Sequence, residues 1–273
     1  MPTGSHKILG VRLDDLTEAE LRAKLVSFLR GDKPKVVVTP NPEFLLSAMQ
    51  DPEFRTILDR ADLSIPDGAG LRFASAALED MEVLKTRHTG VATLELLAAL
   101  CSLEGKRLLL LGGSGKDPEI VAAGFKVKFP TLDVVPLDPG IVDDVTPRLS
   151  EAVLARLASL EPVVIAVALG QGRGRRQGKQ EKVMAAMKDR LPSVRLLIGV
   201  GGAIHTLSHP KLIPPLAWRQ RGVEWLWRLI KQPWRWQRIG RAVVIFPVVV
   251  AWEALMRKRF VTAVKRVSHE LFR

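Results

Sequence analysis

Residues 36–70 read VVVTPNPEFLLSAMQDPEFRTILDRADLSIPDGAG, and this order predicts a strand, a turn and a helix, followed by a second strand, turn and helix. The three valines at 36–38 show no polar alternation, as expected of a strand that is buried on both faces. Pro40 ends that strand, and Pro42 suits the first turn of a helix. The second strand, 63–65, stops at Pro66. Repeated strand and helix units of this kind predict a parallel sheet.

Polar side chains follow both of these strands. Thr39 and Asn41 come after the first strand, and Asp67 comes after the second. Ligands of open parallel sheets bind beyond the carboxyl ends of the strands, so these three residues are expected to share one crevice. An Asp-Gly pair after a strand is also common as a plain turn or helix cap, and from spacing alone both interpretations stay open.

The remaining pattern extends the same architecture. Strands are predicted to begin near residues 36, 63, 108, 132, 163 and 194, with helices between most of them, including 16–29 (capped by Thr17), 91–103, 117–128 and 145–160. The segment 7–9 is predicted to be a short edge strand. The predicted fold is therefore an α/β protein with an open, mostly parallel sheet and helices on both faces, a Rossmann-like arrangement.

Composition limits the class of protein. The 273 residues are 47% hydrophobic, which is enough for a sizeable core. The single cysteine, Cys101, lies in an apolar helical pattern and is predicted to be a buried thiol in a reducing cytoplasm. Residues 1–9 lack the features of a secretory signal, and no uninterrupted apolar run approaches the roughly 20 residues that span a bilayer.

Charge divides the chain into two regions. Residues 211–273 hold 14 Lys or Arg against three acidic residues, whereas residues 1–210 are nearly neutral. All six tryptophans also lie in 211–273. We therefore expect a catalytic α/β domain over 1–210 and a basic, Trp-rich helical appendage over 211–273.

The appendage has the profile of a helix that lies in a membrane interface. Leu226, Leu229 and Ile230 define an apolar stripe beside tryptophans and basic residues, which favours an anionic membrane surface. The apolar run 242–252 has only 11 residues and contains Pro247, so it is predicted to dip into the interface without crossing it. Two alternatives stay open: the stripe packs on the domain or on another subunit, or the basic and aromatic residues bind nucleic acid, which the run 242–252 disfavours.

A glycine-rich loop follows the strand near residue 108. Gly112 and Gly113 begin the sequence GGSGK, whose small residues allow backbone N–H groups to approach an anion. The loop lacks the complete spacing of a P-loop and of the dinucleotide-binding fingerprint. It predicts a nucleotide-contacting loop, and it argues against an ATPase and a dehydrogenase.

Several motifs together resemble the WecG/TagA/CpsF family of bacterial glycosyltransferases. They are TPNPE at 39–43, PDGAG at 66–70, Arg87 with Thr89 and Gly90, KQEK at 179–182, GVGG at 199–202, and GVEWLWRL at 222–229. The resemblance spans roughly residues 7–236. The chain departs from the usual pattern at Gly178, which replaces a proline, by about six inserted residues within 171–178, and at His205, where the family has an aspartate. The inserted Arg173, Arg175 and Arg176 are expected to lie in a solvated loop.

The resemblance implies an inverting, metal-independent enzyme that moves a sugar from a UDP-sugar to a polyprenyl-diphosphate-linked glycan. It implies Asp67 as the base, with Arg87 and Arg228 meeting the charge of the leaving diphosphate, since the chain has no Asp-x-Asp motif. Together with Gly112 and Gly113 of the glycine-rich loop, the residues predicted to contact the substrates are Thr39, Asn41, Gly68, Gln180, Gly201, Gly202, His205, Arg235 and Arg238.

No cofactor, metal or nucleic-acid partner is expected, and self-association stays open. The expected location is the cytoplasmic face of the cell membrane, with the protein peripherally bound. The alternative function is a non-catalytic basic module that binds membrane or nucleic acid and carries a nucleotide-binding α/β body.

Overall fold

Six parallel strands form the centre of the molecule. The computed structural model describes residues 4–79, 83–170, 178–220 and 222–271. The sheet has the order β4-β3-β8-β7-β5-β6, with all five pairings parallel. Its strands are β3 (Lys35–Val38), β4 (Leu63–Ser64), β5 (Leu108–Gly112), β6 (Val134–Leu137), β7 (Val164–Ala168) and β8 (Leu196–Gly199). All six predicted strands are confirmed.

Side chains of the sheet enter two separate cores, one on each face. Leu109 and Leu111 of β5 belong to one core, whereas Leu108 and Leu110 belong to the other. This division is the consequence of the two-residue period of a strand. Because both faces are covered, the strands consist of continuous apolar runs, as the sequence predicted.

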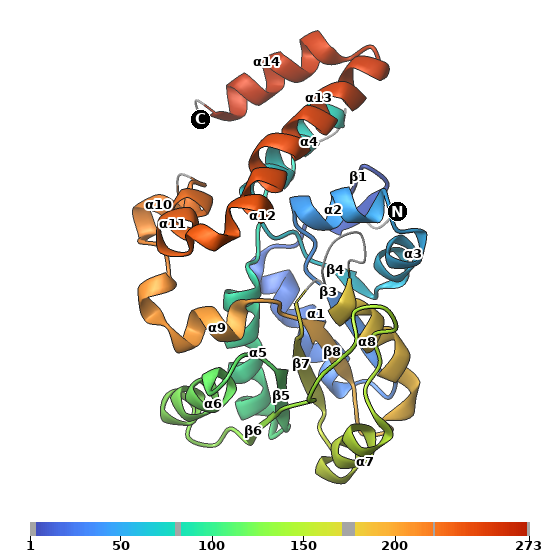
Figure 1. The fold of residues 1–273 in the computed structure, drawn as a ribbon, viewed down its shortest axis with the longest axis vertical. Helices are drawn as coiled ribbons and strands as arrows, with labels where there is room; N and C mark the ends of the chain where they lie inside the picture. The colour runs from blue at the N-terminus through green and yellow to red at the C-terminus, as the bar shows by residue number, and fades with distance from the viewer. Residues whose placement is uncertain (1–3, 80–82, 171–177, 221, 272–273) are drawn as a thin grey trace.

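Helices cover the two faces of the sheet (Figure 1). They are α1 (Glu18–Arg30), α2 (Pro42–Ala48), α3 (Pro52–Arg60), α4 (Ala69–Leu78), α5 (Gly90–Glu104), α6 (Asp117–Lys128), α7 (Glu151–Leu160), α8 (Lys179–Met187) and α9 (Ala203–Ser208), with 3₁₀ turns at Lys188–Arg190 and Pro210–Leu212. Thr17 caps α1 as predicted, in a capping box with Glu20. Cys101 is buried in α5, and burial raises the pKa of its thiol to about 12.

Three predicted elements differ from the structure. The segment 7–9 is no edge strand of the main sheet, because β1 (Ser5–Ile8) pairs only with β2 (Val11–Asp14), in a separate antiparallel hairpin. The helix after β3 divides into α2 and α3, since Asp51 caps a new helix at Pro52. Helix α7 begins at residue 151 because Ser150 caps it there.

The appendage is entirely helical in the part of the chain that the structure describes. It contains α10 (Leu216–Gln220), α11 (Glu224–Lys231), η3 (Pro233–Arg235), α12 (Trp236–Gly240), the π-turn η4 (Arg241–Ile245), α13 (Phe246–Met256) and α14 (Phe260–Leu271). Helices α13 and α14 form a hairpin that lies beside α4 (Figure 1). Phe246, Val250 and Ala254 are buried along the inner side of α13.

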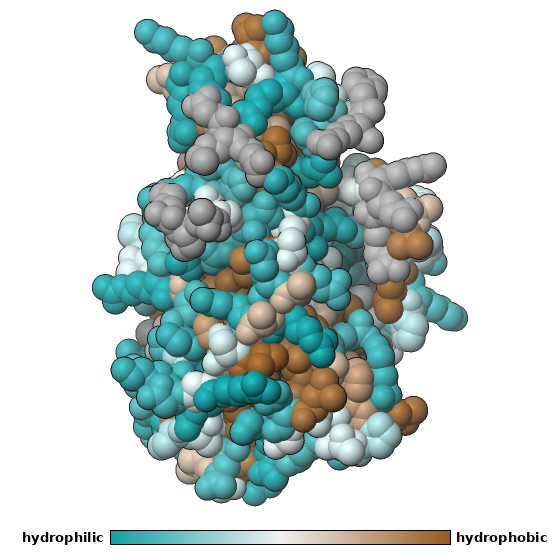
Figure 2. All heavy atoms as spheres, turned by 180° about the vertical axis from the view of Figure 1, so that it is seen from behind, coloured by the Kyte–Doolittle hydropathy of each residue, from teal (hydrophilic) through white to brown (hydrophobic). Residues whose placement is uncertain are grey.

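The apolar run 242–252 lies within a helix that extends well beyond it on the N-terminal side. Among the described residues, one continuous helix, 233–256, has 24 residues and by length and composition could cross a membrane. Pro247 does not break it, since the preceding π-turn widens the backbone where the proline ring would clash. Only 17% of its most apolar window is buried against the protein. The end of the molecule formed by this hairpin shows apolar side chains among hydrophilic ones (Figure 2).

Candidate active site

A small cleft lies beyond the carboxyl ends of β4, β3, β8 and β7, and the appendage closes one side of it. Its volume is about 100 Å³. Nine of the residues predicted for the site line it together: Thr39, Asn41, Asp67, Gln180, Gly201, Gly202, Arg228, Arg235 and Arg238. The topology explains this convergence, because parallel strands all deliver their following loops to one edge of the sheet.

Asp67 is held at the base of the cleft by the backbone around it. Its N–H donates to the carbonyl of Pro40 over 2.8 Å, and its carboxylate accepts a weak 3.4 Å hydrogen bond from the N–H of Gly90. Burial raises the pKa of the Asp67 carboxyl, although the positive charges of Arg228 and Arg87 and the Gly90 N–H oppose that rise. A carboxylate with a raised pKa that faces a cavity is suited to accept a proton.

Thr39 and Asn41 line the cleft, and their side chains also form hydrogen bonds within the protein. The hydroxyl of Thr39 donates to the carbonyl of Gly199 over 3.0 Å, which ties the end of β3 to the end of β8. The side-chain oxygen of Asn41 accepts from the N–H groups of Glu43 and Phe44 and caps α2. Its amide N–H groups remain the part of Asn41 that can donate to a ligand.

Gln180 positions the loop after β8. Its oxygen accepts from the N–H of Gly201 over 2.9 Å, and its nitrogen donates to Oε1 of Glu181 over 2.7 Å. Glu181 is fully buried, its Oε2 has no hydrogen-bond partner among the described residues, and burial raises its pKa to about 7. Gln180 and Glu181 therefore act as a pair that fixes the floor of the cleft.

Local packing explains why a glycine, Gly178, replaces the expected proline before α8. Gly178 has φ +75°, and a Cβ atom there would lie 2.1 Å from the ring of Phe54. Neither a proline nor any other larger residue fits at that position in this backbone. The inserted arginines, Arg173, Arg175 and Arg176, lie outside the described residues.

Three arginines of the appendage converge on the cleft. Arg238 forms an ion pair with Glu43 at the start of α2, with Nη2 2.8 Å from Oε2. Arg235 is half-buried and approaches Gly202, and its pKa is lowered to about 10 by burial and by the charges of Arg228 and Arg238. The three guanidinium groups concentrate positive charge in the cleft, which an anion would offset.

Arg87, which the resemblance predicts to meet the diphosphate, has a carboxylate partner in the structure. It does not line the cleft; instead its guanidinium forms two hydrogen bonds, of 2.6 and 2.7 Å, with the carboxylate of Glu224 in the first turn of α11. This bidentate ion pair joins the body to the appendage. Arg87 still acts on the Asp67 carboxyl through its charge, which lowers the pKa of that group.

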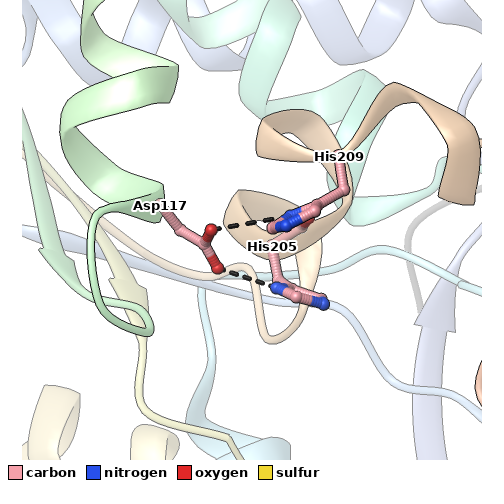
Figure 3. A group of neighbouring side chains, drawn as sticks. All are labelled: Asp117, His205 and His209. Atoms are coloured by element: carbon pink, nitrogen blue, oxygen red, sulfur yellow. Dashed lines mark hydrogen bonds and ion pairs between the residues drawn. The ribbon is translucent and has the colours of Figure 1, made fainter.

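Four further predicted residues, Gly68, Gly112, Gly113 and His205, lie outside the described lining of the cleft. Gly112 and Gly113 both have positive φ, and a Cβ atom at Gly113 would lie 2.7 Å from the ring of Pro118. Close packing therefore accounts for these glycines. His205 instead contacts Asp117 at the start of α6 (Figure 3).

Sequence reasoning missed three carboxylates that support the site. Glu43 and Glu224 pair with the arginines that join the appendage to the body, and Glu181 lies behind Gln180. Each belongs to a motif named above, TPNPE, GVEWLWRL or KQEK. One signal could have identified them. Each carboxylate lies in the same motif as a predicted arginine or amide side chain of the site.

The fold and the cleft define an α/β protein with an anion-attracting site that is completed by an appended helical region. Residues 6–260 match the Glycosyl transferase WecG/TagA/CpsF family, and the chain belongs to that family. It is a glycosyltransferase.

Characterised relatives are similar over most of their length. Three of them are named N-acetylglucosaminyldiphosphoundecaprenol N-acetyl-beta-D-mannosaminyltransferase. The relative from Bacillus subtilis (strain 168) is 26% identical over 75% of this chain and 74% of its own length. The relative from Bacillus spizizenii is 25% identical over 82% and 84%, and the one from Staphylococcus aureus (strain MRSA252) is 24% identical over 91% and 93%.

Proposed function

We propose that this chain transfers a sugar from a UDP-sugar to a hydroxyl group of a polyprenyl-diphosphate-linked glycan, with inversion at the anomeric carbon. The observation that supports this most is that Asp67 from the body and Arg228, Arg235 and Arg238 from the appendage line one cleft. A transferase of this type needs a base for the acceptor and positive charge for the departing diphosphate. The relatives' names support the lipid-linked acceptor.

In the proposed mechanism, Asp67 accepts the proton of the acceptor hydroxyl as its oxygen attacks the anomeric carbon. The bond between that carbon and the diphosphate oxygen breaks on the opposite face, and UDP leaves with the electron pair. Guanidinium groups of Arg228, Arg235 and Arg238 neutralise the charge that develops on the diphosphate. The proposal assigns no step to a metal, because Arg228, Arg235 and Arg238 line the cleft and supply the positive charge that meets the departing diphosphate.

The donor reaches this site only if the appendage moves. The cleft of about 100 Å³ is smaller than the roughly 300–1,000 Å³ typical of ligand pockets. Two ion pairs, Arg87 with Glu224 and Arg238 with Glu43, hold the appendage over it. We propose that α11 and α12 open to admit the nucleotide and then close their arginines on its diphosphate.

The appendage also brings the enzyme to its lipid-linked substrate at the cytoplasmic side of the membrane. Trp234, Trp236 and Trp252 are 70, 63 and 63% exposed, a costly arrangement for a surface that faces only water. Basic residues surround them, as in interfacial helices. Flotation with vesicles that contain anionic lipid should carry the full-length protein upward, and recovery only in the unbound fraction would contradict the membrane role.

Replacing Asp67 with Asn tests the catalytic proposal. The variant keeps the size and polarity of the side chain but removes the base, so transfer should fall by about 10²–10⁴-fold. The assay uses full-length protein, a panel of UDP-sugars that includes UDP-N-acetylmannosamine, and a polyprenyl-diphosphate-linked N-acetylglucosamine acceptor. UDP binding should stay close to that of the wild type. Full transfer activity in the variant would remove the base assignment.

A further inference from the structure

A cluster of two histidines and one aspartate joins α6 to α9, away from the proposed transfer step. Asp117 is the first residue of α6, His205 lies in α9, and His209 follows four residues later at the end of that helix. Nδ1 of His205 lies 2.7 Å from Oδ2 of Asp117, and Nδ1 of His209 lies 3.6 Å from Oδ1. Both rings face the same carboxylate, as Figure 3 shows.

We propose that Asp117, His205 and His209 form a binding site for a divalent transition-metal ion of the zinc type. One ligand atom from each of the three side chains lies within 4.8 Å of the other two. Imidazole nitrogens and a carboxylate oxygen are the ligands that zinc prefers in three-residue sites with an open fourth position.

The distances fit such an ion with a small adjustment. Zinc bonds to nitrogen and oxygen of about 2.0–2.2 Å set neighbouring ligand atoms of a tetrahedral site roughly 3.3 Å apart. The 3.6 Å separation between His209 and Asp117 is already close to this value. The 2.7 Å separation between His205 and Asp117 would open by rotation of an imidazole that is 34% exposed.

The surroundings also resemble those of a metal ligand set. Asp117 is only 5% exposed, and the hydroxyl of Ser208 donates to its Oδ1 over 2.7 Å, which orients the carboxylate as outer partners of metal ligands do. The side chain of His209 is 52% exposed, so solvent reaches one side of the cluster and leaves a path for the ion. With neutral imidazoles the cluster has a charge of −1, which favours a cation.

A hydrogen-bonded ion pair between the aspartate and a protonated histidine is the competing account. In that account Nδ1 of His209 has the hydroxyl of Ser208 and the carbonyl of His205 as its partners, at 2.8 and 3.2 Å. The metal account differs because it uses both rings, which lie 4.6 Å apart between centroids and face one carboxylate.

The ion would link two loops at the edge of the sheet. Helix α6 follows the glycine loop after β5, and α9 follows Gly201 and Gly202, which line the cleft. His205 is also the position at which the sequence departs from the aspartate usual in the resembled pattern. The site would therefore distinguish this chain by a structural metal, separate from the arginines that act on the leaving group.

Cobalt binding to the full-length protein tests the proposal. Protein stripped with EDTA is titrated with Co²⁺ alone, and visible absorption follows the bands of a low-symmetry site, with Zn²⁺ as competitor. We expect one ion per chain, displaced by zinc, and a rise in melting temperature on adding Zn²⁺. His205→Ala and His209→Ala should each weaken binding by at least about 10²-fold.

His269→Ala is the matched control, because His269 is exposed on α14 and lies outside the cluster. It should bind Co²⁺ as the wild type does. Circular dichroism checks that each variant folds. His209→Ala removes a half-exposed side chain, so it keeps the test valid if His205→Ala does not fold. Failure of the wild type to bind Co²⁺, or unchanged binding in both histidine variants, would overturn the site. Neither result depends on transfer activity, so the proposed function is tested separately.

Discussion

The body and the appendage of this protein use apolar residues in opposite ways. Leu197 and Ile198 of β8 are fully buried in two different cores, whereas Val248 and Trp252 of α13 are each 63% exposed. Charge is divided just as unevenly, with 14 basic residues against three acidic ones in 211–273. The body provides a carboxylate at the edge of the sheet, while the appendage provides cations and an exposed apolar surface. The cleft lies where the two meet.

Among changes to the appendage, the largest effect is expected from removing a cation. Arg228→Ala should lower the transfer rate by about 10²–10³-fold, because a guanidinium beside Asp67 and the leaving diphosphate is lost. Rates with full-length protein and lipid-linked acceptor measure this. Arg257→Ala is the control, since Arg257 pairs only with Glu253 one helical turn away among the ion pairs described. Equal loss in both variants would mean that general positive charge, and no particular position, matters.

Stability should depend on the body far more than on the outer face of the appendage. Leu197→Ala removes a fully buried side chain and should lower the free energy of unfolding by about 2–5 kcal/mol. Val248→Ala removes a largely exposed one and should change it by less than about 0.5 kcal/mol. Urea unfolding of both variants checks the contrast. A similar cost at the two positions would show that α13 is covered in solution.

Glu181 makes the stability of the body depend on pH. Its native pKa of about 7 lies above the model-compound value of 4.5, so its contribution is fully present below about pH 4.5 and is lost as pH rises through about 7. The raised pKa corresponds to about 3 kcal/mol. Urea unfolding near pH 4.5 and pH 8 should show that the wild type loses about this much relative to Glu181→Gln. Parallel pH profiles for the two proteins would refute the buried, protonated carboxyl.

The ion pair between Arg87 and Glu224 should have a smaller effect. Glu224→Gln weakens the contact that holds α11 to the body and should cost about 1 kcal/mol, since both side chains are only partly buried. Limited proteolysis should then cut the appendage faster. Glu253→Gln, which affects an exposed pair within one helix, should leave the cleavage rate unchanged. If Glu224→Gln resists cleavage as the wild type does, the ion pair does not secure the appendage.

The apolar runs in the sequence were sufficient to predict the sheet, and the residues that follow two of its strands predicted part of the cleft. A run such as 36–38 has few alternatives to a strand buried on both faces, and the parallel order then places Thr39, Asn41 and Asp67 at one edge. The arginines of the appendage were predicted as site residues from the resemblance to the glycosyltransferase family. Their approach to Asp67 depends on how α11 and α12 pack, which no local pattern encodes.

The sequence alone did not predict the pairs of charged side chains that lie far apart in the chain. Arg87 pairs with Glu224, 137 residues away, and His205 pairs with Asp117, 88 residues away. Each of these side chains had a plausible local interpretation, as a diphosphate contact or a nucleotide contact. The apolar run 242–252 has 11 residues, but the helix that contains it has 24, because the π-turn before Pro247 accommodates the proline ring.

The most direct test of the composite site is a double-mutant cycle on transfer rate with Asp67→Asn and Arg228→Ala. If the carboxylate and the guanidinium act in one step, the double variant should be scarcely slower than the slower single variant. Independent roles would multiply the two losses in the double variant. That multiplied loss, or a wild-type rate for Asp67→Asn, would contradict an active site shared between the body and the appendage.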